Sequence, residues 1–167
     1  MAFHSVEHLL RAALDRPLWE AVLLDDLRDR GVEREASWTR MAGLWEAMRA
    51  SVAGYDPDKR SACGLTGGAA AKVEAAGVEL SGAFVTQVMA TALKVAECNS
   101  CMGRIVAAPT AGASGVLPAV LLPVQAKYAL SDEEILRALY VSAGFGQGIA
   151  TRASIAGAEG GCQAEGG

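Results

Sequence analysis

Residues 131–143 read SDEEILRALYVSA, and this stretch carries the clearest local signal in the chain. Ser131 precedes Glu134 by three positions, which is the spacing of a capping box, where each side chain accepts a hydrogen bond from the backbone N–H of the other residue. The acidic residues between them place negative charge in the first turn, where the helix dipole is positive. The stretch therefore predicts a helix from Ser131 to about Ala143.

Apolar residues recur three or four positions apart through most of the remaining chain, which is the spacing of the buried face of a helix. Ser5 is placed to cap a first helix and Pro17 to begin a second. No stretch sustains the alternation that indicates a strand, so we expect an all-α fold. The predicted helices cover residues 5–30 in two pieces, 38–52, 69–76, 82–97 and the region after 115, where Pro118 and Pro123 favour helix starts or kinks.

The aromatic and methionine side chains of residues 38–52 follow helical spacing, and we expect them in the core. The same spacing predicts an inward apolar face for residues 82–97. That face consists of Phe84, Val88, Met89, Ala92 and Leu93.

The chain has 167 residues, and 51% of them are hydrophobic, which is enough to form the core of one domain covering residues 1–167. Its formal charge of −4 comes from 19 acidic and 15 basic residues, without a basic stretch, so we expect no nucleic-acid partner. No run reaches the roughly 18 apolar residues of a membrane helix, so we expect neither a membrane span nor a signal peptide. Four unevenly placed cysteines favour a reducing cytoplasm, with thiols free for metal.

Three loops rich in small residues separate the predicted helices, and such loops let backbone N–H groups converge on a small anion. The first begins CGLTGGAAAK at Cys63 and fails the Walker pattern, because Lys72 is neither preceded by Gly nor followed by Ser or Thr. Both anion binding and a plain helix-entry turn remain open for it. In the second loop, residues 107–115, Thr110 and Ser114 could hold a carboxylate or cap the next helix, and capping is the favoured interpretation.

Cysteines stand at two further places of interest. Cys98 and Cys101 have the spacing of zinc and redox sites, but the histidines lie far upstream, which favours buried or incidental thiols. Cys162 lies in the third loop, residues 158–167, beside polar groups, where a thiolate could reach an iron or a substrate. A lone cysteine is nevertheless more often inert.

Taken together, three segments resemble the iron–sulfur L-serine dehydratases, α-type chain, in order and spacing. They read CGLTGG from Cys63, MGRIVAAPTAG from Met102 and ASIAGAEGGCQAE from Ala153. The resemblance covers nearly the whole chain, although the N-terminal part matches only in its helical character.

The resemblance implies a helical catalytic domain of a lyase that degrades serine, feeding gluconeogenesis from the cytoplasm. It also implies a [4Fe-4S] cluster held by three cysteines, whose open iron acts as a Lewis acid on the serine hydroxyl. A base removes the α-proton, and aminoacrylate then gives pyruvate and ammonia. A β-type chain and an oligomeric enzyme are the implied partners.

Carried over by position, the resemblance makes Cys162 the first cluster ligand. Thr66 and Thr110 are the side chains expected to contact the serine carboxylate or amine. The α-proton base is unassigned; Lys72 is a candidate, although lysines on helices are usually solvated. The residues expected to surround the substrate are Gly64, Leu65, Thr66, Gly67, Gly68, Pro109, Thr110, Ala111 and Gly112.

The sequence also departs from the family pattern. In the family, the other two cluster ligands are a pair of cysteines at positions that would follow Gly167. We therefore expect this chain to be an N-terminal portion of the α chain that needs the missing segment. Cys63 and Ala69 stand where the family has Ser and Asp. Cys98 and Cys101 stand where small or apolar residues are expected; either they are neutral substitutions, or they join Cys63 and Cys162 in a substitute site.

Two other classes of protein are alternatives to this enzyme. The first is a noncatalytic remnant or interaction domain that keeps the fold without the cluster. The second is a pyridoxal-phosphate dehydratase, which needs a Schiff-base lysine beside a phosphate-binding glycine loop on an α/β fold. None of Lys72, Lys94 and Lys127 has that context.

Overall fold

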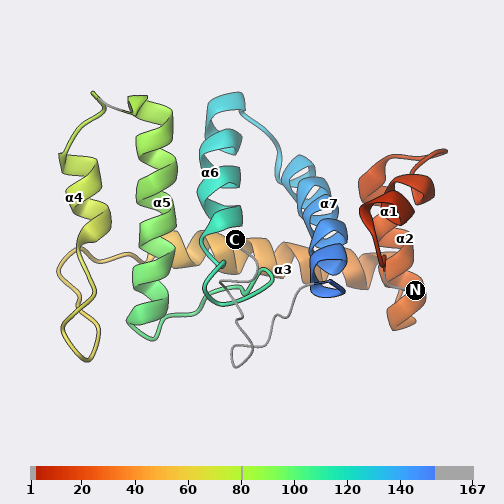
Figure 1. The fold of residues 1–167 in the computed structure, drawn as a ribbon, viewed down its shortest axis with the longest axis horizontal. Helices are drawn as coiled ribbons and strands as arrows, with labels where there is room; N and C mark the ends of the chain where they lie inside the picture. Colours follow the sequence, from red (N-terminus) through yellow and green to blue (C-terminus); the bar gives the residue numbers. More distant parts are fainter. Residues whose placement is uncertain (1–2, 80, 153–167) are drawn as a thin grey trace. The chain divides into compact units, whose positions relative to one another are not determined.

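The computed structural model describes residues 3–79 and 81–152, and every regular element in these ranges is an α-helix, which confirms the all-α prediction (Figure 1). None of these helices combines the length and apolar character needed to cross a bilayer. The helices are α1 (Val6–Ala12), α2 (Leu18–Arg30), α3 (Arg34–Ala53), α4 (Ala69–Ala75), α5 (Gly82–Ser100), α6 (Val116–Tyr128) and α7 (Asp132–Ala150).

The helix ends follow the capping signals of the sequence. The Ser131 hydroxyl accepts a hydrogen bond from Glu134 N (3.3 Å), and the Glu134 carboxylate accepts one from Ser131 N (2.7 Å). Ser5 caps α1 by accepting from His8 N at 3.1 Å. Pro17 is the N-cap residue of α2. The local signals are therefore confirmed.

Helix α7 continues past the predicted end at Ala143 and reaches Ala150. Its glycines do not end it, because Gly144 lies against another helix: a Cβ atom at this position would be 2.6 Å from Val22 Cγ2. Close packing thus offsets the weak helix propensity of glycine.

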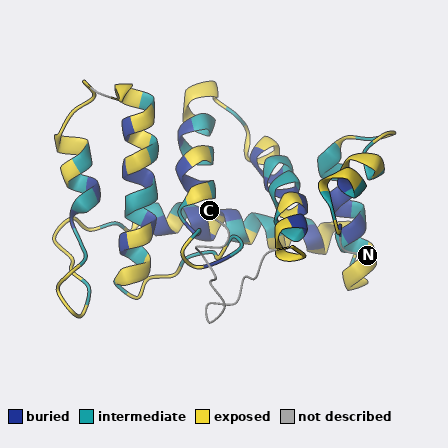
Figure 2. Ribbon diagram, viewed as in Figure 1, coloured by how far each residue is buried: buried dark blue, intermediate teal, exposed yellow. Residues whose placement is uncertain are grey.

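The chain divides into two compact units, and α3 runs from the first into the second at Trp45. The first unit contains α1, α2, the start of α3, and α7. The Tyr140 ring lies in its core and stacks on Trp38 at a centroid distance of 5.6 Å. The hydroxyls of Tyr140 and Ser37 form a hydrogen bond of 2.7 Å. The buried members of this core are Phe3, Leu9, Val22, Leu23 and Tyr140 (Figure 2).

The second unit contains the end of α3 together with α4, α5 and α6, and α5 packs against both α4 and α6. The predicted inward face of α5 is wrong at Met89, whose side chain is 47% exposed. The buried residues are instead mostly small or polar, which lets both packed neighbours of α5 approach closely. These buried residues are Thr86, Ala90, Thr91, Val95 and Glu97.

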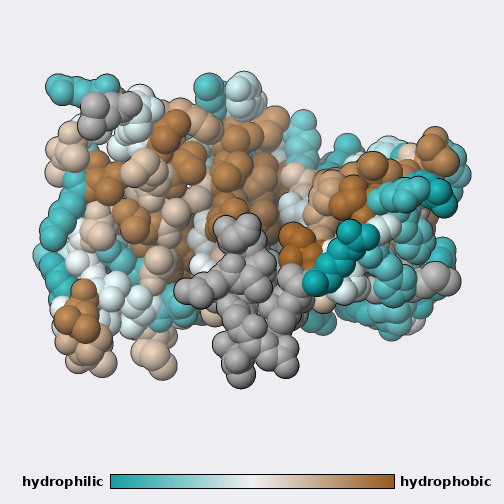
Figure 3. Space-filling model, viewed as in Figure 1, coloured by the Kyte–Doolittle hydropathy of each residue, from teal (hydrophilic) through white to brown (hydrophobic). Residues whose placement is uncertain are grey.

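Apolar side chains also reach the surface of the second unit (Figure 3). Val85 and Met89 of α5 and Val116 and Val120 of α6 are each about half exposed. Single exposed apolar residues are normal on proteins, but several on adjacent helices form an exposed apolar patch.

Candidate functional site

Two of the predicted site loops lie at one end of the second unit. Helix α4 begins, α5 ends and α6 begins at this end, so the loop before α4 and the loop before α6 both lie beside the C-terminal end of α5 (Figure 1). Contacts of α5 with α4 and with α6 hold the three helices together. Their antiparallel order therefore brings residues 61–68 and 107–115, far apart in sequence, to the same end.

Residues 61–66 of the first loop form a tight turn closed by Ser61. Its backbone N–H donates to Thr66 O at 2.9 Å, and its hydroxyl accepts from Thr66 N at 3.1 Å. Gly64, with φ of +74°, donates its N–H to Ser61 O at 2.8 Å. Two anchors at Ser61 thus fix the backbone of Thr66.

Glu97, a residue of α5, holds the end of this loop. Its carboxylate accepts hydrogen bonds from Gly68 N at 3.0 Å and from Ala69 N at 2.5 Å, and the side chain is buried. Both N–H groups belong to the start of α4 and lack partners within the helix. The Glu97 carboxylate therefore occupies the position at the Gly68 and Ala69 N–H groups where a small anion would bind.

Tyr55 lies beside this carboxylate. Its hydroxyl accepts a hydrogen bond from Ala71 N at 3.2 Å. Burial raises the pKa of Tyr55, and the charge of Glu97 and a hydrogen bond with it raise it further. Lys94 lies over the Tyr55 ring, with 5.5 Å between Nζ and the centroid, and pairs with Glu74 at 2.6 Å. Polar contacts from α5 and the segment after α3 thus converge on the start of α4.

Gly67 and Gly68 are required by their surroundings as well as by their positive φ angles of +142° and +76°. A Cβ atom on Gly67 would collide with the carbonyl oxygen of Lys59, and one on Gly68 would lie 3.1 Å from Pro57 O. The glycine pair therefore serves close backbone packing at this turn.

The second loop is held by its own residues. The Thr110 hydroxyl accepts from Ala113 N at 3.3 Å, Ala108 N donates to Thr110 O at 3.2 Å, and Ser114 N donates to Ala111 O at 3.3 Å. Thr110 and Ser114 are both buried. Among the described residues no side chain caps α6, whose N-cap residue is Gly115, so the predicted helix cap is replaced by a bond inside the loop.

The two threonines thus differ. The Thr110 hydroxyl takes part in the fold of its loop, whereas no described residue forms a hydrogen bond with the Thr66 hydroxyl. Thr66 is half-buried, and Leu65 beside it is 89% exposed. Of the two predicted substrate contacts, Thr66 therefore has its side-chain oxygen free for a ligand.

The cysteines of the described ranges do not form a metal site. Cys63 is exposed, and Cys98 and Cys101 are half-buried free thiols. A hydrogen bond with Ser61 lowers the pKa of Cys63, while burial raises the pKa of Cys98. Within residues 3–79 and 81–152, no three His, Cys, Asp or Glu side chains are placed to hold a metal ion.

The predicted ligand Cys162 lies outside the described residues, as does the third loop. The described residues therefore supply no set of ligands for a [4Fe-4S] cluster, which needs several thiolates, and the prediction for Cys162 stays untested. Lys72, the candidate base, is exposed on α4, as the alternative of a solvated lysine predicts.

Glu97 and Tyr55 were missed by the sequence interpretation. Glu97 is one of only two charged residues in α5, and it falls at helical spacing from the buried Thr86 and Ala90. A lone acidic residue on the inward face of an apolar helix was the available signal. Tyr55 follows a glycine in a turn and offered no comparable signal.

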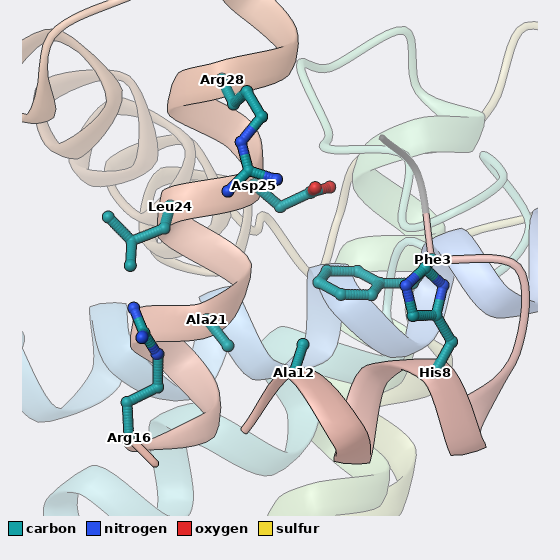
Figure 4. Close-up of a pocket in the computed structure, with 8 residues that line it drawn as sticks. All are labelled: Phe3, His8, Ala12, Arg16, Ala21, Leu24, Asp25 and Arg28. Atoms are coloured by element: carbon teal, nitrogen blue, oxygen red, sulfur yellow. The ribbon is translucent and has the colours of Figure 1, made fainter. Parts of the chain in front are cut away.

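The first unit has cavities of its own. One of about 330 Å³ opens between α1 and α2, lined by aromatic, basic and acidic side chains (Figure 4). A second, of about 140 Å³, lies beside the Ser37 and Tyr140 hydroxyls. None of the predicted substrate-binding residues lines either cavity.

Comparisons with known proteins give a consistent result. The profile of the serine dehydratase alpha chain family matches residues 11–167. The probable L-serine dehydratase, alpha chain, of Bacillus subtilis (strain 168) is 33% identical over 168 residues, covering 98% of this chain and 56% of the relative. The L-serine dehydratase, alpha chain, of Peptoniphilus asaccharolyticus is 47% identical over 89 residues, covering 53% of this chain and 30% of the relative.

A third relative, the L-serine dehydratase of Streptomyces coelicolor (strain ATCC BAA-471 / A3(2) / M145), is 32% identical over 179 residues. That match covers 98% of this chain and 37% of the relative. The chain thus spans about half, or less, of the length of these relatives. No solved structure shows a significant match.

Proposed function

The chain belongs to the serine dehydratase alpha chain family, and we propose that it forms part of an L-serine ammonia-lyase. The enzyme would convert serine to pyruvate and ammonia in the cytoplasm, as an oligomer with a β-type chain. Residues 1–167 would be part of a single catalytic domain. One observation supports the proposal beyond family membership: both glycine loops lie beside the same end of α5.

We assign the described residues a role in binding serine. Hydroxyl and backbone N–H donors suit a carboxylate, and hydroxyl oxygens also accept from an ammonium group. In the first loop the N–H groups of Gly68 and Ala69 already bind Glu97, so Thr66 is the group we assign to the substrate. In the second loop the backbone of residues 109–112 would form the facing wall, with Thr110 holding its shape.

The proposed reaction is a β-elimination. The C–H bond at the α-carbon breaks as its proton passes to a base, the electron pair forms the double bond, and the C–O bond to the hydroxyl breaks. The aminoacrylate formed tautomerises to an imine, and water hydrolyses the imine to pyruvate and ammonia. Hydroxide is a poor leaving group, and a [4Fe-4S] cluster with Cys162 among its ligands would supply the Lewis acid when bound.

The test is serine-dependent pyruvate formation by the complete enzyme that contains this chain. Thr66→Val removes the hydroxyl, and we expect the KM for serine to rise about tenfold, the usual effect of losing one hydrogen bond to a charged group. Thr39→Val, at an exposed position of α3, is the matched control and leaves KM unchanged.

Two results would contradict the proposal. If the folded, cluster-loaded wild-type enzyme forms no pyruvate from serine, the chain is a noncatalytic interaction domain. If Thr66→Val and Thr39→Val have the same KM as the wild type, the first loop is not part of the serine site.

A further inference from the structure

Glu97 is a buried acidic residue that the proposed reaction does not use. Burying a carboxylate is costly unless donors replace the water it loses. Here the Gly68 and Ala69 N–H groups do so, and the Tyr55 hydroxyl lies nearby. The structure therefore satisfies Glu97 with groups from a segment about 28 residues earlier in the chain.

The bonds of Glu97 determine where the first loop lies. Gly68 is two residues from Thr66, and the backbone of Thr66 is anchored at its other side by Ser61. With Gly68 held by Glu97 and Thr66 held by Ser61, the short segment between them has little freedom. The position of the Thr66 hydroxyl relative to α5 therefore depends on Glu97.

The same residue lies where α5 passes into the second loop. Cys101 N donates to Glu97 O at 2.9 Å, and Gly103 N donates to Cys98 O at 2.7 Å, which closes the last turn of α5. The chain then continues into residues 107–115. One end of α5 thus holds the first loop through the Glu97 side chain and leads into the second through its backbone.

We propose that Glu97 is a positioning residue of the serine site, fixing the first glycine loop so that Thr66 faces the substrate; this rests on the proposed function. Glu97 is not a catalytic residue in this proposal, because its oxygens accept hydrogen bonds from the Gly68 and Ala69 N–H groups. Its effect on serine passes through the loop backbone.

The test is Glu97→Gln in the complete enzyme. The amide keeps one acceptor oxygen and turns an NH₂ group toward the second backbone N–H, so one of the two bonds is lost. We expect the KM for serine to rise about tenfold while kcat changes by less than about threefold, because the loop moves and the reacting groups stay. Glu35→Gln, at an exposed position in the first turn of α3, is the matched control and leaves both constants unchanged.

A second readout does not depend on catalysis. Amide hydrogen exchange of Gly68 and Ala69, followed by NMR, is expected to speed up about tenfold in Glu97→Gln, while Ala113 in the second loop keeps its protection. If Glu97→Gln does not fold, Tyr55→Phe removes the hydroxyl beside Glu97 and is expected to change KM and exchange in the same direction, but less.

The outcomes separate this inference from the proposed function. An active wild-type enzyme whose Glu97→Gln variant keeps its KM, or loses only kcat, overturns the positioning role and leaves the function intact. Unchanged exchange at Gly68 and Ala69 also overturns it. A wild-type enzyme that forms no pyruvate, with faster exchange in Glu97→Gln, refutes the proposed function instead.

Discussion

The two glycine loops at the end of α5 are alike in composition but are held in different ways. The first is fixed at its end by Glu97, a side chain from a later helix. The second is fixed by bonds among its own residues, with Thr110 at the centre. A loop of the first kind depends on the packing of two helices, whereas a loop of the second kind depends mainly on its own sequence. A substitution that weakens the first loop should therefore also disturb the packing of α4 on α5, whereas one in the second loop should act mainly within that loop.

The largest effect is expected from Gly67→Ala in the first loop. The new Cβ atom would meet the Lys59 carbonyl oxygen and lie 2.8 Å from Arg60 Cδ, at a φ of +142° that residues with side chains rarely adopt. We expect the free energy of unfolding to fall by about 2 to 4 kcal/mol. Urea denaturation followed by circular dichroism measures it.

Gly64→Ala in the same turn is the matched control for that change. Its φ of +74° is also positive, but a Cβ atom there would have no atom of the described residues within 4 Å. The expected loss is about 1 kcal/mol, which is the cost of the left-handed conformation alone. Equal losses for the two variants would show that backbone packing at Lys59 does not hold the loop.

A smaller effect distinguishes the two threonines. Thr110→Val removes the acceptor of the Ala113 N–H in a buried loop, so we expect a loss of about 1 kcal/mol in the free energy of unfolding. Thr66→Val removes a hydroxyl that bonds to no described residue, and its stability should stay within about 0.5 kcal/mol of the wild type. The same urea titration measures both variants. A larger loss of unfolding free energy for Thr66→Val than for Thr110→Val would mean that the Thr66 hydroxyl, and not that of Thr110, holds its loop in place.

The smallest effect concerns two thiols, Cys63 in the first loop and Cys98 near the end of α5. The pKa of Cys63 is lowered by its hydrogen bond with Ser61, and that of Cys98 is raised by burial. The thiolate is the reactive form, so Cys63 should react with iodoacetamide at lower pH than Cys98. Mass spectrometry of the alkylated peptides between pH 6 and 9 measures both profiles.

Ser61→Ala serves as the control for the thiol experiment. Removing the hydroxyl should shift the Cys63 profile to higher pH and leave that of Cys98 in place. Coinciding profiles for Cys63 and Cys98 in the wild type would contradict the difference in their surroundings.

The features that the sequence predicted correctly are those set by neighbouring residues. The Ser131 and Glu134 capping box, the Ser5 cap and the start of α2 after Pro17 all depend on groups a few positions apart. The family resemblance rested on short loop motifs in the same way. Such features can be predicted from the sequence because they depend little on which distant residues pack nearby.

The features that the sequence interpretation missed depend on distant groups. The continuation of α7 through Gly144 requires a neighbouring helix at Val22, and the burial of Glu97 requires α4 to begin beside α5. The exposure of Met89 has the same origin, because α5 turns smaller residues toward its two neighbours. The serine-contacting role of the loops and the iron ligand at Cys162 stay predictions.

Gly144 also limits how α7 can be seated in its unit. Successive residues of an α-helix are turned by about 100°, so rotating α7 by one position would bring Ala143 or Phe145 to the spot beside Val22 and Leu9. A Cβ atom at that spot would force the Val22 side chain to shift. The missing side chain of Gly144 therefore favours the observed rotation of α7 about its own axis.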